Sequence, residues 1–256
     1  MSGKNAREER RQERLREEGE TAGRERRERL VKLGSATAFL AIVVVAVLIV
    51  IGQSGSDGGD AGNIVGAAEV RAELDGIPQR GLTLGEESAA VTLVEFGDLQ
   101  CPACKGFAEG IVPEVIASKV RSGEAKIEFR NFTIIGEESV TAGAAAVAAG
   151  QQGRGWNFIE LFYRNQGIEA SGYVTDEFLT EVARGAGVPD IARWNVDRRD
   201  RAGSLREVQR SSEEAERLGL TGTPSFAVFG PESDGVEVLG TPGSAGALEE
   251  AIEAAA

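Results

Sequence analysis

The sequence predicts an α/β domain with a helical insertion, preceded by a single transmembrane helix. Three observations lead to this prediction. Residues 91–96 form a short apolar segment typical of a buried strand, residues 139–218 are dominated by helical patterns, and one long uncharged run lies near the N-terminus. With 256 residues, the chain has room for one to two domains and a substantial core.

Composition excludes several kinds of site. The chain has no histidine and only two cysteines, which excludes histidine-dependent catalytic triads, histidine-ligated haem and four-cysteine metal sites within one chain. The formal net charge of −13 argues against a protein that binds nucleic acid through its phosphates. A hydrophobic content of 41% argues against a wholly disordered chain.

Residues 1–32 form a charged segment that we expect in the cytoplasm. They hold 11 basic and 8 acidic residues and almost no apolar ones, a pattern typical of a solvated helix or an unfolded segment. An arm that binds nucleic acid is the alternative, and the small net positive charge argues against it.

We expect a transmembrane helix over residues 33–52. No charged residue occurs from Leu33 to Ser56, and a helix of this range spans about 30 Å, the thickness of a hydrocarbon core. A cleaved signal peptide is one alternative, but the charged lead and the apolar run are both long for one. A buried core helix is the other, and it would not need flanking charges. The basic residues before the helix predict a signal anchor with the N-terminus in the cytoplasm and the following domain outside.

A Gly-rich flexible linker over residues 53–69 precedes a folded domain over residues 70–256, whose insertion covers about 137–218. Along this domain the hydrophobic pattern predicts, in order, a central strand at 91–96, a helix from Cys101 to about Val120 kinked at Pro113, a strand at 125–132, helices at 139–151, 156–164, 175–184 and 205–218, an antiparallel hairpin of 225–229 and 236–239, and a helix at 245–254.

The residues that carry chemistry, Cys101-Pro102-Ala103-Cys104, lie where the central strand ends and a helix begins. A helix N-terminus presents free N–H groups and a positive dipole, which stabilise a thiolate. Proline suits the first helical turn because its missing N–H would have no partner there. We expect Cys101 to be the exposed nucleophile and Cys104, on the core-facing stripe of the helix, to be the resolving thiol.

Three other uses of the cysteine pair are weighed against redox activity. A structural disulfide closing so short a loop stabilises by roughly 2 kcal/mol, against about 4.7 kcal/mol for a 100-residue loop. A zinc half-site would need carboxylates or a second chain, and a copper chaperone usually has a histidine. We therefore expect a redox-active Cys101–Cys104 disulfide and no metal or organic cofactor.

Glu95 shares a strand face with Val91 and Leu93, which predicts burial beneath the start of the helix. Burial raises the pKa of a carboxyl group, and in a chain without histidine Glu95 is the best candidate to move the proton of Cys104. The alternative is a carboxylate that reaches water at the sheet edge. Thr223-Pro224 precedes the hairpin, and base rates alone favour a plain turn with a trans bond there.

Several sequence stretches occur together in the order found in one known family. They are GIPQ (76–79), LG (84–85), VTLVEFGDLQCPAC (91–104), IVPE (111–114), WNFIELFYRNQ (156–166) and GTPSF (222–226). On these stretches, residues 76–240 resemble the DsbA-like, thioredoxin-fold disulfide oxidoreductases that are membrane-anchored in Gram-positive (actinobacterial) bacteria.

The resemblance implies a thioredoxin-like fold with the helical block inserted between its halves. It also implies that Thr223-Pro224 is a cis-proline loop beside the cysteine turn, with the Thr223 backbone pairing to an extended substrate, and that Glu95 is the family's buried acid. Ala103 departs from the strongly oxidising members, which carry histidine there. With Pro102 it tunes the redox centre, and alanine at this position implies that the Cys101 thiol is less acidic and that the protein is a weaker oxidant.

The resulting expectation is an extracytoplasmic thiol:disulfide oxidoreductase that acts as the oxidant of secreted or cell-surface proteins. The resemblance implies reoxidation by a membrane partner of the DsbB or vitamin K epoxide reductase type. One alternative is a reductase or an isomerase; isomerases are usually dimers, whereas we expect a monomer. The others are a tethered peptide-binding module without catalysis and a metal-binding module.

Overall fold

The computed structural model describes residues 64–256. The predicted cytoplasmic segment (1–32), the predicted transmembrane helix (33–52) and most of the predicted linker lie outside these residues. Within residues 64–256, no helix is both long enough and apolar enough to cross a bilayer. The first helix of the described residues, α2, covers Ala67–Leu74 and so begins shortly before the expected start of the domain.

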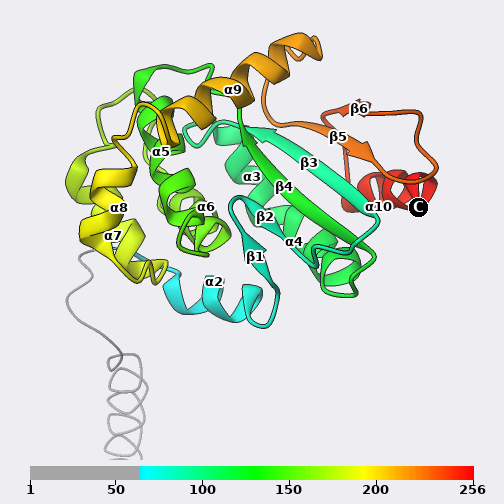
Figure 1. The fold of residues 1–256 in the computed structure, drawn as a ribbon, viewed down its shortest axis with the longest axis horizontal. Helices are drawn as coiled ribbons and strands as arrows, with labels where there is room; N and C mark the ends of the chain where they lie inside the picture. Colours follow the sequence, from blue (N-terminus) through cyan, green and yellow to red (C-terminus); the bar gives the residue numbers. More distant parts are fainter. Residues whose placement is uncertain (1–63) are drawn as a thin grey trace, which may run out of the picture. The chain divides into compact units, whose positions relative to one another are not determined.

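A six-stranded sheet forms the centre of the domain, in the order β1-β2-β4-β3-β5-β6 (Figure 1). The long strand β3 lies between β4, to which it is parallel, and β5, to which it is antiparallel, as expected for a central strand. The two short strands at one edge escaped the sequence analysis because two residues each give no periodic pattern. The strands are β1 (Gln79–Arg80), β2 (Thr83–Leu84), β3 (Val91–Gly97), β4 (Ala125–Asn131), β5 (Ser225–Phe229) and β6 (Glu237–Gly240).

The connection from β3 to β4 is helical but not one continuous helix. It consists of α3 (Pro102–Gly110), α4 (Val112–Val115) and a π-helical turn, η1 (Ile116–Val120). The break at Ile111 lies two residues before Pro113, because a proline lacks the N–H for the helical ladder and its ring clashes with the preceding turn. The kink predicted at Pro113 is confirmed, as a break between α3 and α4.

The helical insertion lies between β4 and β5 and gathers at one end of the sheet, whereas the last helix, α10 (Ala245–Ala255), lies at the other end (Figure 1). The sequence analysis missed α8, because this short helix buries only Trp194 and presents no apolar stripe. The helices of the insertion are α5 (Glu137–Gly150), α6 (Gly155–Arg164), α7 (Asp176–Gly185), α8 (Ile191–Asp197) and α9 (Ser204–Arg217).

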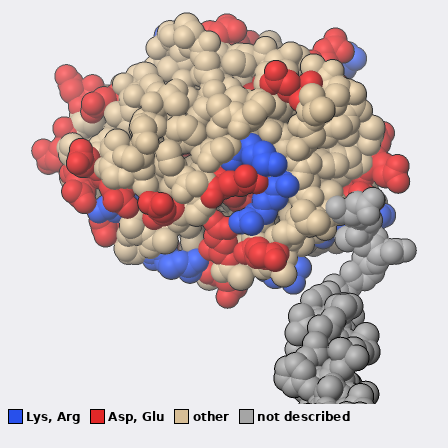
Figure 2. Space-filling model, turned by 180° about the vertical axis from the view of Figure 1, so that it is seen from behind, with Lys and Arg blue, Asp and Glu red and all other residues tan. Residues whose placement is uncertain are grey.

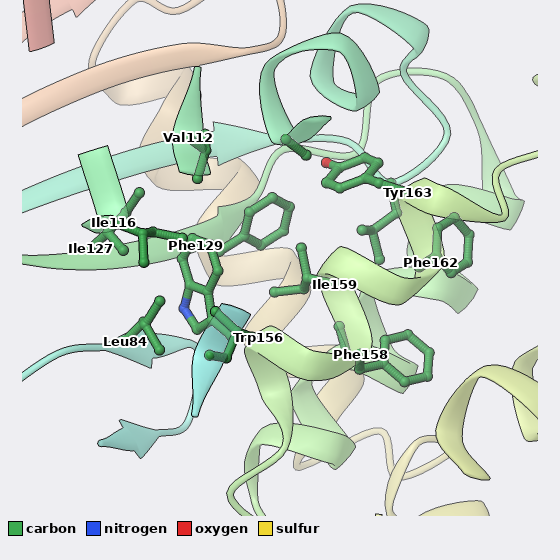
Figure 3. Close-up of a cluster of buried hydrophobic side chains, with 14 of the residues drawn as sticks. Leu84, Val112, Ile116, Ile127, Phe129, Trp156, Phe158, Ile159, Phe162 and Tyr163 are labelled. Atoms are coloured by element: carbon green, nitrogen blue, oxygen red, sulfur yellow. The ribbon is translucent and has the colours of Figure 1, made fainter. Parts of the chain in front are cut away.

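The two faces of β3 enter separate hydrophobic clusters. Val91 and Leu93 join the main core with α3, α6 and α10, while Val94 and Phe96 join a smaller cluster under α9. The main core is built around α6, whose aromatic and aliphatic side chains meet those of β4 and β2 (Figure 3). Because side chains alternate along a strand, Glu95 lies on the same face as Val91 and Leu93, within the main core.

Figure 2 shows the face of the domain opposite to that in Figure 1. This face carries acidic side chains over much of its edge and one mixed group of basic and acidic side chains near its centre. No continuous basic surface is visible among the described residues on this face.

Candidate active site

Cys101 lies at the N-cap of α3, directly after the loop that leaves β3. Its backbone is extended, and its Sγ atom accepts a hydrogen bond from the Cys104 N–H at 3.4 Å. The sulfur thus satisfies one of the N–H groups that a helix N-terminus leaves without a partner. Pro102 occupies the first helical turn, and both Pro102 and Ala103 are exposed.

These surroundings lower the pKa of Cys101 to about 6. The main cause is the hydrogen bond with the Cys104 side chain, followed by contributions from the Thr223 side chain and from the backbone N–H groups of Cys104 and Ala103, while partial burial opposes them. Near neutral pH the Cys101 sulfur is therefore mostly a thiolate.

Cys104 has the opposite character, although it lies one helical turn away. Its side chain is fully buried in the main core. Burial, together with the hydrogen bond to Cys101 and the negative charges of Glu95 and Cys101, raises its pKa well above the usual thiol value. Cys104 therefore holds its proton until a base removes it.

Thr223 and Pro224 lie beside the cysteine turn, and the peptide bond between them is cis. When it is protonated, the Cys101 thiol donates to the Thr223 carbonyl at 3.4 Å. This contact corrects one expectation, because Cys101 is only 8% exposed rather than openly exposed, though it is more accessible than Cys104 at 0%. The rings of Phe107 on α3 and Phe226 on β5 lie 5.6 Å apart and connect the two halves of the site.

Glu95 is buried beneath the helix start, with only 2% of its surface exposed. Its neighbours across the sheet are Phe129 and Phe226, and its Oε1 atom has no hydrogen-bond partner among residues 64–256. Burial, and secondarily the negative charge of Cys101, raise the pKa of Glu95 to about 8. A carboxyl group with this pKa can both accept and donate a proton near neutral pH.

The loop between β3 and α3 is held by side chains that the sequence analysis did not identify. Both carboxylate oxygens of Asp98, which is fully buried, accept backbone N–H bonds: Oδ1 from Gln100, and Oδ2 from Ile134 and Ile135. The Asp98 carbonyl accepts from the Cys101 N–H at 2.9 Å. Asp98 thereby fixes the loop against the start of the helical insertion.

Two residues of the helical insertion complete this support. The Gln166 side-chain amide donates to the Leu99 carbonyl at 2.7 Å and to the Cys101 carbonyl at 3.1 Å. The Tyr163 hydroxyl donates to the Asp98 carbonyl at 3.3 Å, and Figure 3 shows it at the end of α6 that faces the loop. The insertion therefore holds the main chain of the cysteine turn in place.

Each predicted site residue therefore has a defined place. Cys101, Cys104, Glu95 and Thr223-Pro224 converge on the N-terminus of α3, while Pro102 and Ala103 form its exposed tip. Among residues 64–256, no group of three or more Cys, Asp and Glu side chains is arranged to hold a metal ion.

Comparisons with known proteins agree with this geometry. The profile of the family described as thioredoxin matches residues 79–252. A probable disulfide bond formation protein D of Bacillus cereus is 29% identical over 153 residues, which cover 58% of this chain and 69% of that protein.

Two solved structures share the fold. The oxidised form of BdbD from Bacillus subtilis has a TM-score of 0.59 and 23% identity, covering 69% of this chain and 96% of that one. MdbA, a thiol-disulfide oxidoreductase from Corynebacterium diphtheriae, has a TM-score of 0.53 and 20% identity, covering 70% and 93%. The chain therefore belongs to the thioredoxin family.

Proposed function

We propose that this protein is an extracytoplasmic, membrane-anchored oxidant that passes the Cys101–Cys104 disulfide to secreted or cell-surface proteins. The observation that carries the proposal is the contrast between the two cysteines: the Cys101 sulfur accepts the Cys104 N–H at the N-terminus of α3, whereas Cys104 is fully buried. A stabilised Cys101 thiolate favours the reduced form of the enzyme, and an enzyme with a stable reduced form gives its disulfide away readily.

The first step begins with the disulfide form of the enzyme. A substrate thiolate attacks Cys101 Sγ, a mixed disulfide forms, and the bond between Cys101 and Cys104 breaks. Cys104 leaves as a thiolate in an apolar place and takes the proton of the neutral Glu95 carboxyl group. Glu95 thus serves as the general acid for the leaving sulfur.

The second step releases the product. A second thiolate of the substrate attacks the substrate sulfur of the mixed disulfide, and the Cys101 thiolate leaves. A thiol with a pKa of about 6 is a good leaving group near neutral pH. Two electrons have moved from the substrate dithiol to the enzyme, which now carries a Cys101 thiolate and a Cys104 thiol.

Reoxidation reverses the proton transfer. Cys101 attacks a disulfide of the oxidising partner, and Glu95, now ionised, removes the proton of Cys104 so that this sulfur can close the enzyme disulfide. We propose a membrane partner of the DsbB or vitamin K epoxide reductase type for this role. Thr223 supports binding of an extended chain, since its backbone lies directly beside Cys101.

The test is the equilibrium reduction potential of the cysteine pair in the purified full-length chain, titrated in glutathione buffers. A potential near or above roughly −200 mV supports disulfide donation. A potential well below that value would indicate a reductase instead. Failure to form the disulfide at all would favour a peptide-binding module without catalysis.

A further inference from the structure

A polar pocket lies at the N-terminal end of α6, at the opposite end from the cysteine turn. Residues of α2, of the chain that leads from α2 to β1, of the start of α6 and of the turn after α7 line it. Trp156 and Tyr163 mark the two ends of α6 in Figure 3, and Tyr163 supports the active-site loop. Because α6 has 10 residues, it is about 15 Å long. The pocket is therefore a place separate from the redox centre.

The size of the pocket suits a small ligand. Its volume is about 280 Å³, which is below the range of the clefts that bury drug-sized molecules. A single ion or one small headgroup fits such a space.

Two arginines line the pocket without a carboxylate partner. Arg71 lies on α2, and Arg154 is the N-cap residue of α6. Neither forms an ion pair among residues 64–256. Arg154 Nε donates to the Gly187 carbonyl at 3.2 Å, which holds the guanidinium group at the pocket wall. The remaining guanidinium N–H groups are donors of the kind that bind phosphate and carboxylate oxygens.

The start of α6 adds a buried donor. Asn157 lines the pocket although it is only 6% exposed. Its Oδ1 atom accepts from Gln79 Nε2 at 2.9 Å, while its Nδ2 group has no hydrogen-bond partner among the described residues. A buried amide group without a partner costs stability unless a ligand or water accepts its hydrogen bond. The unused donor therefore points to an acceptor in the pocket.

Charge in the pocket favours an anion. The first turn of α6 holds no acidic residue, and no side chain caps the helix from Arg154, so the positive end of the helix dipole is not compensated there. Asp75 is the one carboxylate among the lining residues and opposes an anion, but the two arginines outnumber it. The pocket thus has a net positive charge in a chain whose net charge is −13.

We propose that this pocket binds a phosphate group, held by Arg71, Arg154 and Asn157 Nδ2 at the positive end of α6. A phosphate group has enough acceptor oxygens to reach donors from two elements at once, and helix N-termini bind such groups readily. Once bound, it connects α2 with α6, the helix that supports the cysteine turn. The inference does not rest on the proposed function.

Two sources of the phosphate group are compatible with the sequence. The predicted transmembrane helix ends at residue 52, and α2 begins at Ala67 after only 14 intervening residues. The group is therefore either free phosphate or part of a phospholipid headgroup. Two probes separate these sources. They are inorganic phosphate and glycerophosphoglycerol, the soluble diester that corresponds to the headgroup of phosphatidylglycerol.

The test is calorimetric titration of the full-length chain in a nonionic detergent, at an ionic strength held constant with chloride. We expect saturable binding of one phosphate group per chain. Arg154→Gln should weaken it by about tenfold or more, because a charged hydrogen-bond donor is lost. Binding of the diester at least as tight as that of inorganic phosphate identifies a lipid headgroup as the source. Binding of inorganic phosphate alone identifies free phosphate.

Three further variants make the result decisive. Asn157→Asp keeps the size of the side chain and an acceptor for Gln79, but it replaces the free donor with a carboxylate oxygen and should abolish binding. Asp75→Asn removes the opposing charge and should tighten binding by about threefold or more, a gain that a damaged fold does not produce. Arg206→Gln, at an exposed position of α9 outside the pocket, should bind like the unchanged protein.

The absence of saturable binding for both probes would overturn this inference. Equal weakening in Arg154→Gln and Arg206→Gln would also overturn it, because the total charge of the chain and not the pocket would then attract the anion. An affinity that changes in neither Arg154→Gln nor Asp75→Asn would place the anion elsewhere. None of these outcomes affects the reduction potential that tests the proposed function.

Discussion

The N-terminus of α3 and the core directly beneath it differ sharply in what they offer a charged group. Above, the Cys101 sulfur has N–H donors from Ala103 and Cys104 and the positive end of a helix. Below, Cys104 and Glu95 lie among apolar side chains, and one Glu95 oxygen has no hydrogen-bond partner in the described part of the chain. The pKa of the thiol is lowered at Cys101 and raised at Cys104, although the two residues are only three positions apart. The position of a cysteine relative to the helix end, and not its residue type, therefore sets its reactivity.

The largest expected effect comes from replacing Cys101, the cysteine that lies among the N–H donors. Cys101→Ser should lower the rate of dithiol oxidation by about 10³-fold or more, because without Cys101 the chain cannot form the disulfide that it passes to a substrate. Cys104→Ser, treated with glutathione disulfide, should instead accumulate a mixed disulfide at Cys101, since Cys101 still attacks but no second cysteine displaces glutathione. Mass spectrometry of acid-quenched samples distinguishes the two. Equal accumulation of mixed disulfide in both variants would contradict the assigned roles.

Glu95→Gln tests the apolar side of the comparison. Near neutral pH, closure by Cys104 should slow by about 100-fold, because no general base remains beside a thiol that holds its proton strongly. The rate of attack by Cys101 should change little. A closure rate that depends on pH in the same way as in the unchanged protein would show that another group moves the proton.

The same substitution should stabilise the fold in a pH-dependent way. Glu95 has a pKa of about 8 when folded and near 4.5 when unfolded, so the pH-dependent cost of its burial is absent below pH 4.5 and increases up to pH 8. Glu95→Gln removes this cost and should raise the free energy of unfolding of the reduced protein at pH 8 by roughly 4 kcal/mol. Urea unfolding at pH 4.5 and pH 8 measures it; an equal change at both values would contradict burial as the cause.

Gln166→Leu should have a smaller effect. It removes the side-chain amide that donates to the Leu99 and Cys101 carbonyls, and it should lower the free energy of unfolding by about 1–3 kcal/mol. The control is Gln209→Leu at an exposed position of α9, where the side chain donates to Glu213, its one hydrogen-bond partner among the described residues, and a change within about 0.5 kcal/mol is expected. Equal losses in both variants would show that Gln166 does not hold the cysteine turn.

The sequence predicted what depends on local pattern. Strand alternation predicted the burial of Glu95, and helical periodicity predicted that Cys104 faces the core. The support of the turn was not predictable in this way, because Gln166 lies 67 residues from Leu99 and amide side chains show no periodic signal. The contact between Thr223 and Cys101 does not follow from local pattern either, since the two residues lie 122 positions apart. The expectation that the Thr223-Pro224 loop lies beside the cysteine turn came from the family resemblance.

The smallest effect concerns Ala103, at the exposed tip of the turn, where a histidine would add a positive charge beside the thiolate. Ala103→His should lower the pKa of Cys101 further and stabilise the reduced form relative to the disulfide. The reduction potential should then rise by about 30 mV for each unit by which the pKa falls. Titration in glutathione buffers at pH 6 and pH 8 tests the cause, because imidazole loses its charge between them and the rise should shrink at pH 8. An equal rise at both pH values would indicate that shape, not charge, acts at this position, and no rise at either would show that the backbone donors already saturate the stabilisation of the sulfur.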